Sequence, residues 1–447
     1  MEGFNAAGGS LPIYASGPVY GLYIVLLVAL MRRTTSRAGK FVLFAVGVRL
    51  MLSGLHEFTY RPSPAGLSYN ALGSVLIFAI GLFVVRWRKL SDPTLVPFYP
   101  LLAVMILSAL VNNQVPALTT ALTKFGYLII LIMAVIDAAE DEGPDKLFSR
   151  LILVFAFPFV LQIASIALGV SKPGETDGAT SWIGGFHHEG AFSLTLATGV
   201  LAACLAQSVP LRLRILVMLV GVAGIILANY RTSILGVLPL IAAALVVGVP
   251  RRFVPEQRGL VLGFMFLVGA AALSGAVIAG QERFSDLGTA TASDSVLIQP
   301  KGDFSTEQRR VMSGRPYIWS GYIYAWINGD AEQKLIGAGA ETWPQNFELY
   351  AHNTLVSSLY EIGVVGVFAV LFLWGSMLWL AVLAKGWPRP ELVAGHFSFF
   401  VLNQATMPMW LIEGLILYGL LCGYTIYCFK HRRVSRARPI SAERALC

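Results

Sequence analysis

The groups in this sequence best suited to chemistry are ionisable side chains that lie beside long apolar runs. His352 and Asn353 end a long polar stretch and lead directly into an apolar segment. Ionisable groups at the rim of a bilayer are costly and usually functional, and a neutral imidazole can accept a proton from a hydroxyl. At about 100° per residue, Gly363 and Gly366 fall near the helix face of His352, which predicts a closely packed seam below the imidazole. The alternative is a histidine that only caps the helix.

Arginines form the second group of candidates, because they can bind an anion. Arg231 lies between two apolar runs, and Thr232 or Ser233 is expected to cap the helix that follows and to leave backbone N–H groups free. An arginine beside a helix N-terminus forms a site for phosphate. Three more arginines of the long polar stretch are candidates of the same kind: Arg309, Arg310 and Arg315. The alternatives are a side chain that reaches the lipid headgroups and a solvated basic patch.

The composition defines the elements that must position these groups. Of the 447 residues, 56% are hydrophobic and 13% are charged, whereas a soluble domain has about 25% charged residues. This excludes a compact water-soluble fold, a disordered chain and a coiled coil. The four cysteines are too scattered for a disulfide scaffold or a zinc site. The sequence therefore predicts an all-α polytopic membrane protein.

Apolar runs of roughly 20 residues are expected to cross the bilayer as helices. Thirteen such runs occur, at 17–31, 41–56, 69–86, 98–112, 117–136, 151–169, 191–207, 214–230, 233–249, 260–280, 362–384, 393–410 and 411–429. With the N-terminus outside, the cytoplasmic segments carry 22 lysines and arginines and the short outer loops carry two. Topology thus accounts for the net charge of +8 without nucleic-acid binding.

The chain is predicted to have four parts. Residues 1–280 hold helices 1–10, residues 281–350 form an extracytoplasmic catalytic loop, residues 351–429 hold helices 11–13, and residues 430–447 form a basic cytoplasmic tail. Within the loop, aromatic and aliphatic residues at near-helical spacing over 306–326 predict a helix on the membrane surface.

One stretch of the chain resembles a known family. From His352 to Gly366 it reads His-Asn, nine residues, Gly-x-x-Gly, which resembles the signature of O-antigen ligases and of the related O-antigen and exopolysaccharide polymerases. The sequence from Gly314 resembles their Gly-Arg-x-x-x-Trp element, and Arg231 followed by hydroxyl residues fits the same enzymes. The resemblance is best over 214–384. Relatives often have twelve helices with both ends inside, whereas the basic residues here favour thirteen.

The resemblance implies a GT-C-like glycosyltransferase of the bacterial inner membrane, with its active site on the periplasmic side. It would move an oligosaccharide from a polyprenyl (undecaprenyl) diphosphate to an acceptor glycan in one inverting step. Arg231 and Arg315 would stabilise charge on the departing diphosphate, and His352 would accept the proton of the attacking hydroxyl. No metal or other cofactor is expected, since the chain has no Asp-x-Asp pair. A polymerase, which adds to another lipid-linked repeat, is slightly favoured over a ligase, which adds to lipid A-core.

Further residues are expected to contact this substrate. They are Asn353, Arg309, Arg310, Arg49, Lys124, His187 and His188. The two histidines would touch sugar. Arg49 and Lys124 either line a cavity for the lipid phosphate or pair with Glu57 or with backbone carbonyls. Asn403, Gln404 and Glu413 are expected to satisfy hydrogen bonds between helices.

A lipid-linked glycan flippase or another multi-helix transporter is the rival function. Such a protein would also have many helices and buried basic residues. Transporters usually contain repeated halves, and this sequence shows no internal repeat.

Overall fold

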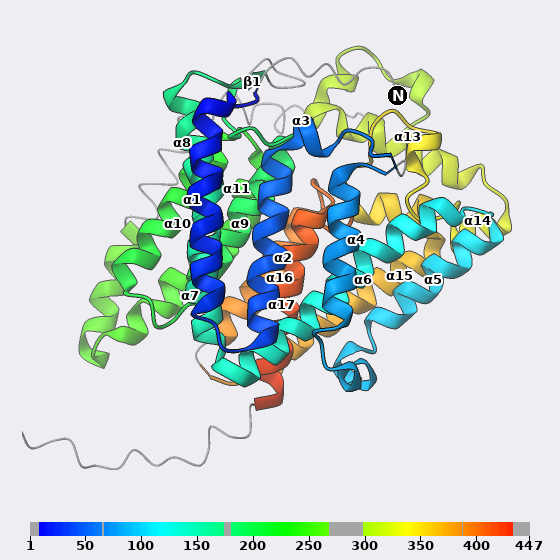
Figure 1. Cartoon of the computed structure of the whole chain (residues 1–447). Coiled ribbons are helices and arrows are strands. Elements are labelled where there is room, and N and C mark those ends of the chain that lie inside the picture. Colours follow the sequence, from blue (N-terminus) through cyan, green and yellow to red (C-terminus); the bar gives the residue numbers. More distant parts are fainter. Residues whose placement is uncertain (1–8, 65–66, 174–179, 268–297, 387, 432–447) are drawn as a thin grey trace, which may run out of the picture.

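The computed structural model is almost entirely helical (Figure 1) and describes residues 9–64, 67–173, 180–267, 298–386 and 388–431. In these ranges the strands are β1 (Lys172–Pro173) and β2 (Thr180–Ser181), which pair antiparallel. Six helices of this part of the chain are long and apolar enough to cross a membrane. The predicted all-α polytopic membrane protein is confirmed.

The described helices follow one another along the chain with short connections. The longer ones are α1 (Ile13–Arg32), α2 (Arg37–Gly54), α4 (Tyr69–Leu82), α5 (Phe98–Val111), α6 (Val115–Glu142), α7 (Pro144–Val154), α8 (Ala156–Ala167), α9 (Glu189–Leu205), α10 (Leu211–Leu227), α11 (Arg231–Ala242), α13 (Arg315–Ile327), α15 (Thr354–Leu383), α16 (Arg389–Asn403) and α17 (Ile412–Lys430). The shorter ones are α3 (His56–Thr59), α14 (Ala331–Ile336) and seven one- or two-turn segments: η1 (Trp87–Ser91), η2 (Pro93–Leu95), η3 (Ala243–Gly248), η4 (Pro250–Arg252), η5 (Lys301–Asp303), η6 (Gln308–Gly314) and η7 (Trp343–Gln345).

Twelve of the thirteen predicted apolar runs correspond to helices of the structure. The run at 151–169 falls on two helices, α7 and α8, because Pro158 has no N–H to donate to the carbonyl of Val154. The run at 260–280 is helical as far as residue 267, and the rest of it lies outside the described residues.

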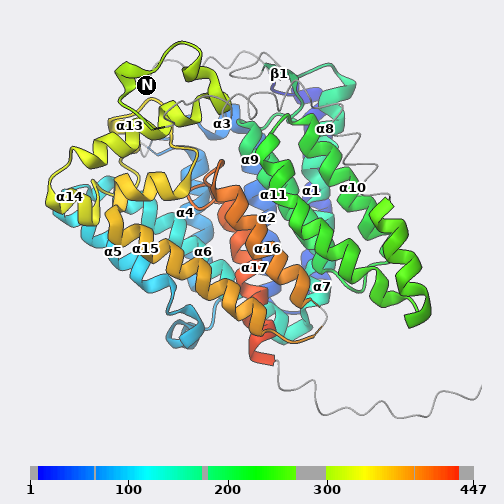
Figure 2. The ribbon, with the colours of Figure 1, turned by 180° about the vertical axis from the view of Figure 1, so that it is seen from behind.

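Two helices, α6 and α17, form the centre of the bundle. Almost all of α17 is buried, and α6 packs along it. Small residues allow this approach: a Cβ at Gly419 would lie 2.8 Å from Leu131, and one at Gly423 would lie 2.7 Å from Val135. Around this pair α2, α9 and α15 form the next layer (Figure 2), whereas most of α1 is exposed.

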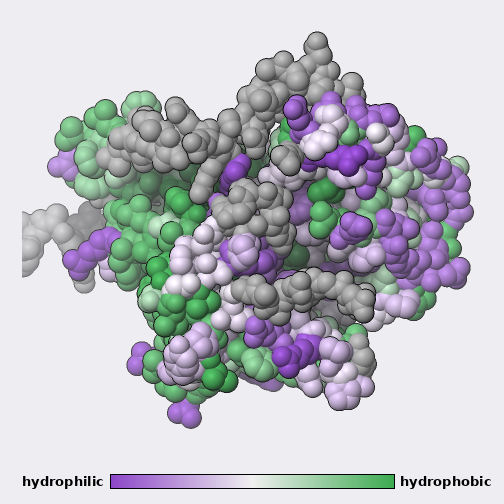
Figure 3. All heavy atoms as spheres, turned by 90° about the horizontal axis from the view of Figure 1, so that it is seen from above, coloured by the Kyte–Doolittle hydropathy of each residue, from purple (hydrophilic) through white to green (hydrophobic). Residues whose placement is uncertain are grey.

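The two ends of the bundle differ in structure. Figure 1 shows α3, β1 and α13 at one end and the C-terminal end of α17 at the other. Seen from the end that carries α13, hydrophilic residues gather over the side that α13 and α14 occupy (Figure 3). We call this end the α13 end.

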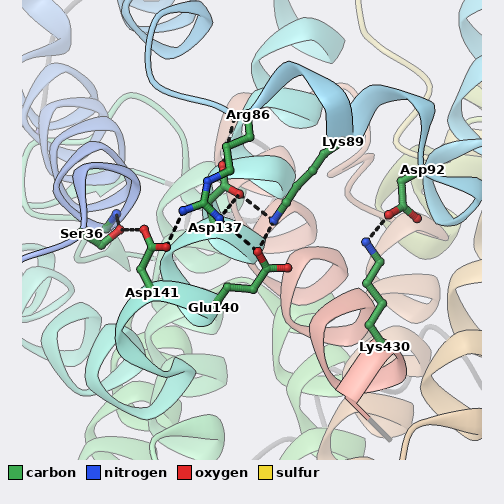
Figure 4. A network of polar contacts seen from close by, with 9 residues as sticks. Ser36, Arg86, Lys89, Asp92, Asp137, Glu140, Asp141 and Lys430 are labelled. Carbon is green, nitrogen blue, oxygen red and sulfur yellow. Dashed lines mark hydrogen bonds and ion pairs between the residues drawn. The ribbon is translucent and has the colours of Figure 1, made fainter. Parts of the chain in front are cut away.

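At the opposite end, polar and charged residues form a network around Arg86 and Lys89, with the ion pair of Lys430 and Asp92 beside it (Figure 4). Together these residues are Ser36, Arg86, Lys89, Asp92, Asp137, Glu140, Asp141 and Lys430. Lys89 Nζ lies 2.6 Å from Asp137 and 2.7 Å from Glu140, and Arg86 Nη2 lies 2.6 Å from Asp141. Lys430, the last residue of α17, pairs with Asp92 before α5. These contacts therefore fix the ends of α6 and α17 to the segment between α4 and α5.

Candidate active site

The helix that follows His352 is broken, which changes the predicted geometry. His352 lies before the N-cap residue Asn353 and has φ 55°. Gly363 interrupts α15 with φ 67° and ψ −171°. A regular helix from His352 to Gly366 was expected, and this expectation is wrong, so the predicted shared face of the three residues does not exist.

The end of α14 fills the break in α15. A Cβ at Gly363 would lie 2.3 Å from the carbonyl oxygen of Leu335, so only glycine allows this approach. Carbonyl groups that the break leaves free accept bonds from the next turn of the loop: Ala338 N donates to Tyr360 O at 3.0 Å and Gly339 N to Glu361 O at 2.8 Å. The close packing predicted at Gly363 is therefore present, but its partner is the outer loop.

Glu361 holds this junction together from inside α15. The side chain is buried, and its two oxygens accept bonds from Ser357 Oγ at 2.9 Å and from the backbone N–H of Glu341 at 2.7 Å. Lys124 on α6 lies 2.5 Å from Glu341 and donates to the carbonyl of Trp410 at 3.0 Å. Lys124 thus pairs with Glu341 and a backbone carbonyl, the second of the two roles expected for it, with Glu341 in place of Glu57.

The amide group of Asn353 makes hydrogen bonds within the protein through both its oxygen and its nitrogen. Its Oδ1 caps α15 by accepting from the N–H groups of Leu355 and Val356 at 2.9 and 3.1 Å. Its Nδ2 donates to the carbonyl of Gln404 at 3.1 Å. Thr354 Oγ1 donates to Asn403 at 2.6 Å, so the segment after α16 is fixed to the start of α15, as expected of these amides.

One face of α13 holds the chain that leads into His352. Trp319 Nε1 donates to the carbonyl of Ala351 at 2.8 Å, and Tyr322 Oη donates to the carbonyl of Leu349 at 2.9 Å. Tyr322 is buried and stacks on Phe347 at 3.9 Å between ring centroids. The helix predicted within 306–326 is present as α13, and Trp319 and Tyr322 on it pack against the protein; its position on the membrane surface stays a prediction.

Arg315, the first residue of α13, joins the outer loop to α11. Its Nη2 donates to Thr232 Oγ1 at 3.2 Å. α11 begins at Arg231, and its N-cap, Tyr230, makes no side-chain capping bond. The expected capping by Thr232 or Ser233 is thus wrong, because both residues lie inside the first turn. Thr232 instead holds the guanidinium of Arg315 beside the start of α11, next to Arg231.

His352 lies in a largely buried aromatic setting. Its ring is 4.0 Å from that of Tyr350, and Tyr350 is 6.1 Å from His188. Among the described residues, Nδ1 of His352 is buried and has no hydrogen-bond partner. Burial, and then the neighbouring Arg315 and His188, lowers the pKa of His352 to about 3. The imidazole is therefore neutral at physiological pH.

Backbone strain gathers around the same residues. Seven non-glycine residues of the described ranges have positive φ: Asn113, Asn229, Met312, Ser313, Glu341, His352 and Met407. Each lies in a segment that carries a candidate residue or contacts one; Met312 and Ser313, for example, directly precede the turn into Arg315. Such conformations cost about 1–3 kcal/mol each and cluster at functional sites. No residue pattern in the sequence predicts them.

The structure places other candidates away from this group. Arg49 is 1% exposed, pairs with Glu413 at 3.5 Å and donates to Asn70 Oδ1 at 2.6 Å, so its charge is neutralised within the bundle. Arg49 also donates to the backbone carbonyl of Asn70 at 3.2 Å, so one expected alternative, a backbone carbonyl, is confirmed, and Glu413 takes the place of Glu57. Arg309 lies over the ring of Tyr317 at 5.3 Å, and of Arg310 only the backbone is described.

The two adjacent histidines have different surroundings. His188 caps α9, and its ring contacts those of Tyr230 and Tyr350, which brings it to the candidate site. His187 packs against His56 and Tyr60. No three His, Cys, Asp or Glu side chains in the described ranges lie close enough together to hold a metal ion.

Sequence reasoning missed several residues of the site. Tyr350 and Tyr230 frame the imidazole of His188, and Glu361 fixes the broken helix. Tyr350 lies only two residues before His352, and Glu361 directly precedes the apolar run at 362–384, so the sequence could have pointed to both positions. Their partners come from distant segments, which the sequence alone does not reveal.

Comparison with known families agrees with the residues gathered here. Residues 216–371 match the family described as O-antigen ligase. This segment contains α11, α13 and the first part of α15, and with them Arg231, Arg315 and His352. Among curated proteins, none matched the chain. The predicted resemblance to the O-antigen ligase and polymerase superfamily is confirmed over this segment, and the described helices are those of a multi-pass membrane protein.

Proposed function

We propose that this protein is a glycosyltransferase that moves an oligosaccharide from a polyprenyl diphosphate to an acceptor glycan on the periplasmic side of the inner membrane. One arrangement supports this most strongly. Arg315 of α13 bonds to Thr232 beside Arg231, and one helical turn later Trp319 holds the carbonyl next to His352. The side chain of Arg315 therefore lies beside the start of α11, which begins at Arg231, and α13 also fixes the backbone next to His352, which supports a shared site at the α13 end.

The arginines act on the leaving group. As the bond between the anomeric carbon and the diphosphate breaks, its electron pair stays on the phosphate oxygen. Guanidinium groups bind such oxygens in pairs and keep their charge at every physiological pH. Fixed cations aimed at developing charge stabilise the transition state, so Arg231 and Arg315 take the role that a divalent metal has in other transferases.

His352 acts on the acceptor. The attacking hydroxyl oxygen forms the new bond to the anomeric carbon, and its proton passes to the imidazole. The low pKa of His352 keeps the imidazole unprotonated before substrate binds. A bound diphosphate brings negative charge beside Arg315, which raises the pKa of His352 and makes it a better base. Attack from the face opposite the leaving group inverts the anomeric configuration.

The decisive experiment is reconstitution with a purified undecaprenyl-diphosphate oligosaccharide in vesicles, with and without a chelator. We expect transfer that the chelator does not reduce. A ladder of products indicates a polymerase, which we favour, and one addition to lipid A-core indicates a ligase. No transfer with either acceptor would contradict the proposal, and loss of transfer with the chelator would overturn the metal-independent mechanism.

Variants separate an enzyme from a flippase. We expect His352→Ala to abolish transfer while donor binding is kept, and Arg231→Lys and Arg315→Lys to lower transfer at least tenfold although charge is unchanged. Arg389→Lys, an exposed arginine at the start of α16, is the matched control and should retain full activity. A flippase would tolerate His352→Ala, so full activity in that variant would contradict the assignment.

A further inference from the structure

A pocket lined by both apolar and polar residues opens at the α13 end, and neither Arg231 nor Arg315 lines it. It has a volume of about 310 Å³ and lies between the start of α1 and the junction of α2 and α3. Its lining includes Ser10, Ser16, His56, Glu57 and Gly184. Pockets of about 300–1,000 Å³ are typical of small-molecule sites. The function proposed above does not use this pocket.

The polar groups of the pocket suit hydroxyl donors. The carboxylate of Glu57 makes no hydrogen bond or ion pair with any described residue. Nδ1 of His56 lies 2.7 Å from the carbonyl of Gly185 and must be the donor, because a carbonyl only accepts. Nε2 of His56 is then an acceptor. No lysine or arginine lines the pocket, whereas a carboxylate does, and the nearby Arg61 donates to the backbone carbonyl of Glu57 outside that lining, so the lining disfavours phosphate.

Two groups of rings, joined only through the adjacent backbone of His187 and His188, form a row from the pocket to the candidate catalytic histidine. The ring of His56 lies 5.5 Å from that of His187, whose neighbour His188 lies 6.1 Å from Tyr350. Tyr350 in turn lies 4.0 Å from His352. Aromatic faces pack well against the C–H groups of sugar rings, and the row begins at the group that takes the acceptor's proton. It therefore follows the acceptor rather than the diphosphate.

We infer that this pocket binds an uncharged sugar residue of the acceptor glycan, several sugars away from the hydroxyl that attacks. Glu57 and Nε2 of His56 accept hydrogen bonds from its hydroxyls, and the row from His187 to Tyr350 lies beneath the sugars between. This inference rests on the proposed function. It makes acceptor length, and not only the terminal sugar, a determinant of affinity.

Kinetics with acceptors of two lengths test the pocket. For Glu57→Gln we expect the KM of an acceptor with two repeat units to rise about tenfold, since a charged acceptor bond is lost, while kcat stays unchanged. The KM of a terminal monosaccharide acceptor should not change. Glu332→Gln, an exposed carboxylate on α14 at the same end, is the control. Equal KM values for Glu57→Gln and the wild type would overturn the inference.

A binding measurement separates this inference from the proposed reaction. The probe is the lipid-free two-repeat oligosaccharide released from the acceptor by mild acid, titrated calorimetrically into His352→Ala protein. We expect binding that Glu57→Gln weakens about tenfold in the same background. Retained binding without any transfer by the wild type would refute the reaction and leave the pocket standing. Transfer by the wild type with binding unaffected by Glu57→Gln would refute the pocket alone.

Discussion

The reactivity of His352 depends on groups that fix its backbone and lower its proton affinity. Its φ of 55° is unfavourable for a residue with a side chain, so neighbours must hold it. Trp319 does this through the carbonyl of Ala351, and Asn353 does it by capping α15. Arg315, which we propose as part of the anion site, also lowers the pKa of the imidazole.

Trp319 is predicted to be a positioning residue. Trp319→Phe keeps the ring but removes the N–H that donates to Ala351, a bond worth about 1 kcal/mol. We expect kcat to fall about fivefold while KM for the donor stays unchanged. Steady-state kinetics in vesicles measure both.

Trp326→Phe is the matched control. Trp326 lies on α13 like Trp319, but its Nε1 donates to the carbonyl of Lys334 on α14, away from His352. It should leave kcat within twofold of the wild type. If Trp319 had a purely structural role, Trp319→Phe would lower the unfolding temperature of the protein as much as Trp326→Phe does. The kcat of the folded fraction would then be unchanged.

The pH dependence should reflect the low pKa of His352. An ordinary imidazole has a pKa of about 6.5, and with a pKa of about 3 the free enzyme keeps its neutral, proton-accepting form throughout pH 5 to 8. We therefore expect kcat/KM, which reports the free enzyme, to stay flat over this range. Because bound diphosphate raises the pKa, the acid limb of kcat should lie at higher pH than that of kcat/KM. A fall in kcat/KM with a midpoint near pH 6.5 would contradict this.

The site could be predicted in part, and the reason differs by residue. His352 and Arg231 were proposed because an imidazole or a charge at the edge of an apolar run is rare, and Arg315 was proposed because Gly314–Trp319 resembles an element of the family. Asn353 was assigned to substrate although it is a cap, since the same amide serves either purpose. Glu361 was missed because its partner, the backbone of Glu341, comes from the outer loop.

At the scale of elements, the break in α15 is what lets the outer loop reach the membrane helices. Apolar length predicted this helix and eleven others, because burial in lipid demands about 20 apolar residues whatever the tertiary contacts. The break was not predicted. In the sequence, a glycine in an apolar run can indicate either close helix packing or a residue of positive φ. Only the contact of Gly363 with Leu335 distinguishes these two roles.

Gly363→Ala tests the break. The new methyl group would lie 2.3 Å from the backbone of Leu335, and alanine at φ 67° is strained. We expect a loss of about 2–4 kcal/mol of stability as α14 is pushed away. Thermal unfolding and proteolysis of the outer loop in nanodiscs measure the effect.

The same helix offers a control for this substitution. Gly375 has open space around its Cβ position and no positive φ, so Gly375→Ala should change stability by less than about 1 kcal/mol. If both variants were equally stable, the junction between α14 and α15 would not be rigid.

At the scale of the whole molecule, two opposite ends must face two compartments. The sequence assigns them by counting basic residues, and the structure places the Arg86 network at one end and the candidate site at the other. Neither observation fixes the orientation in the membrane by itself. Because the two ends belong to one bundle, however, the compartment that one end faces determines the compartment that the other end faces.

Cysteine labelling decides the orientation of both ends at once. Cys204, Cys422 and Cys428 are buried, so a variant with Cys447→Ser has no accessible thiol among its described residues. In that background we expect Ser305→Cys, exposed in the outer loop, to react with a membrane-impermeant maleimide in spheroplasts. Ser91→Cys, exposed beside the Arg86 network, should react only after permeabilisation. The opposite pattern would put His352 and both arginines on the cytoplasmic side. The exported, polyprenyl-linked acceptor is not present there, so this result would contradict the proposed reaction.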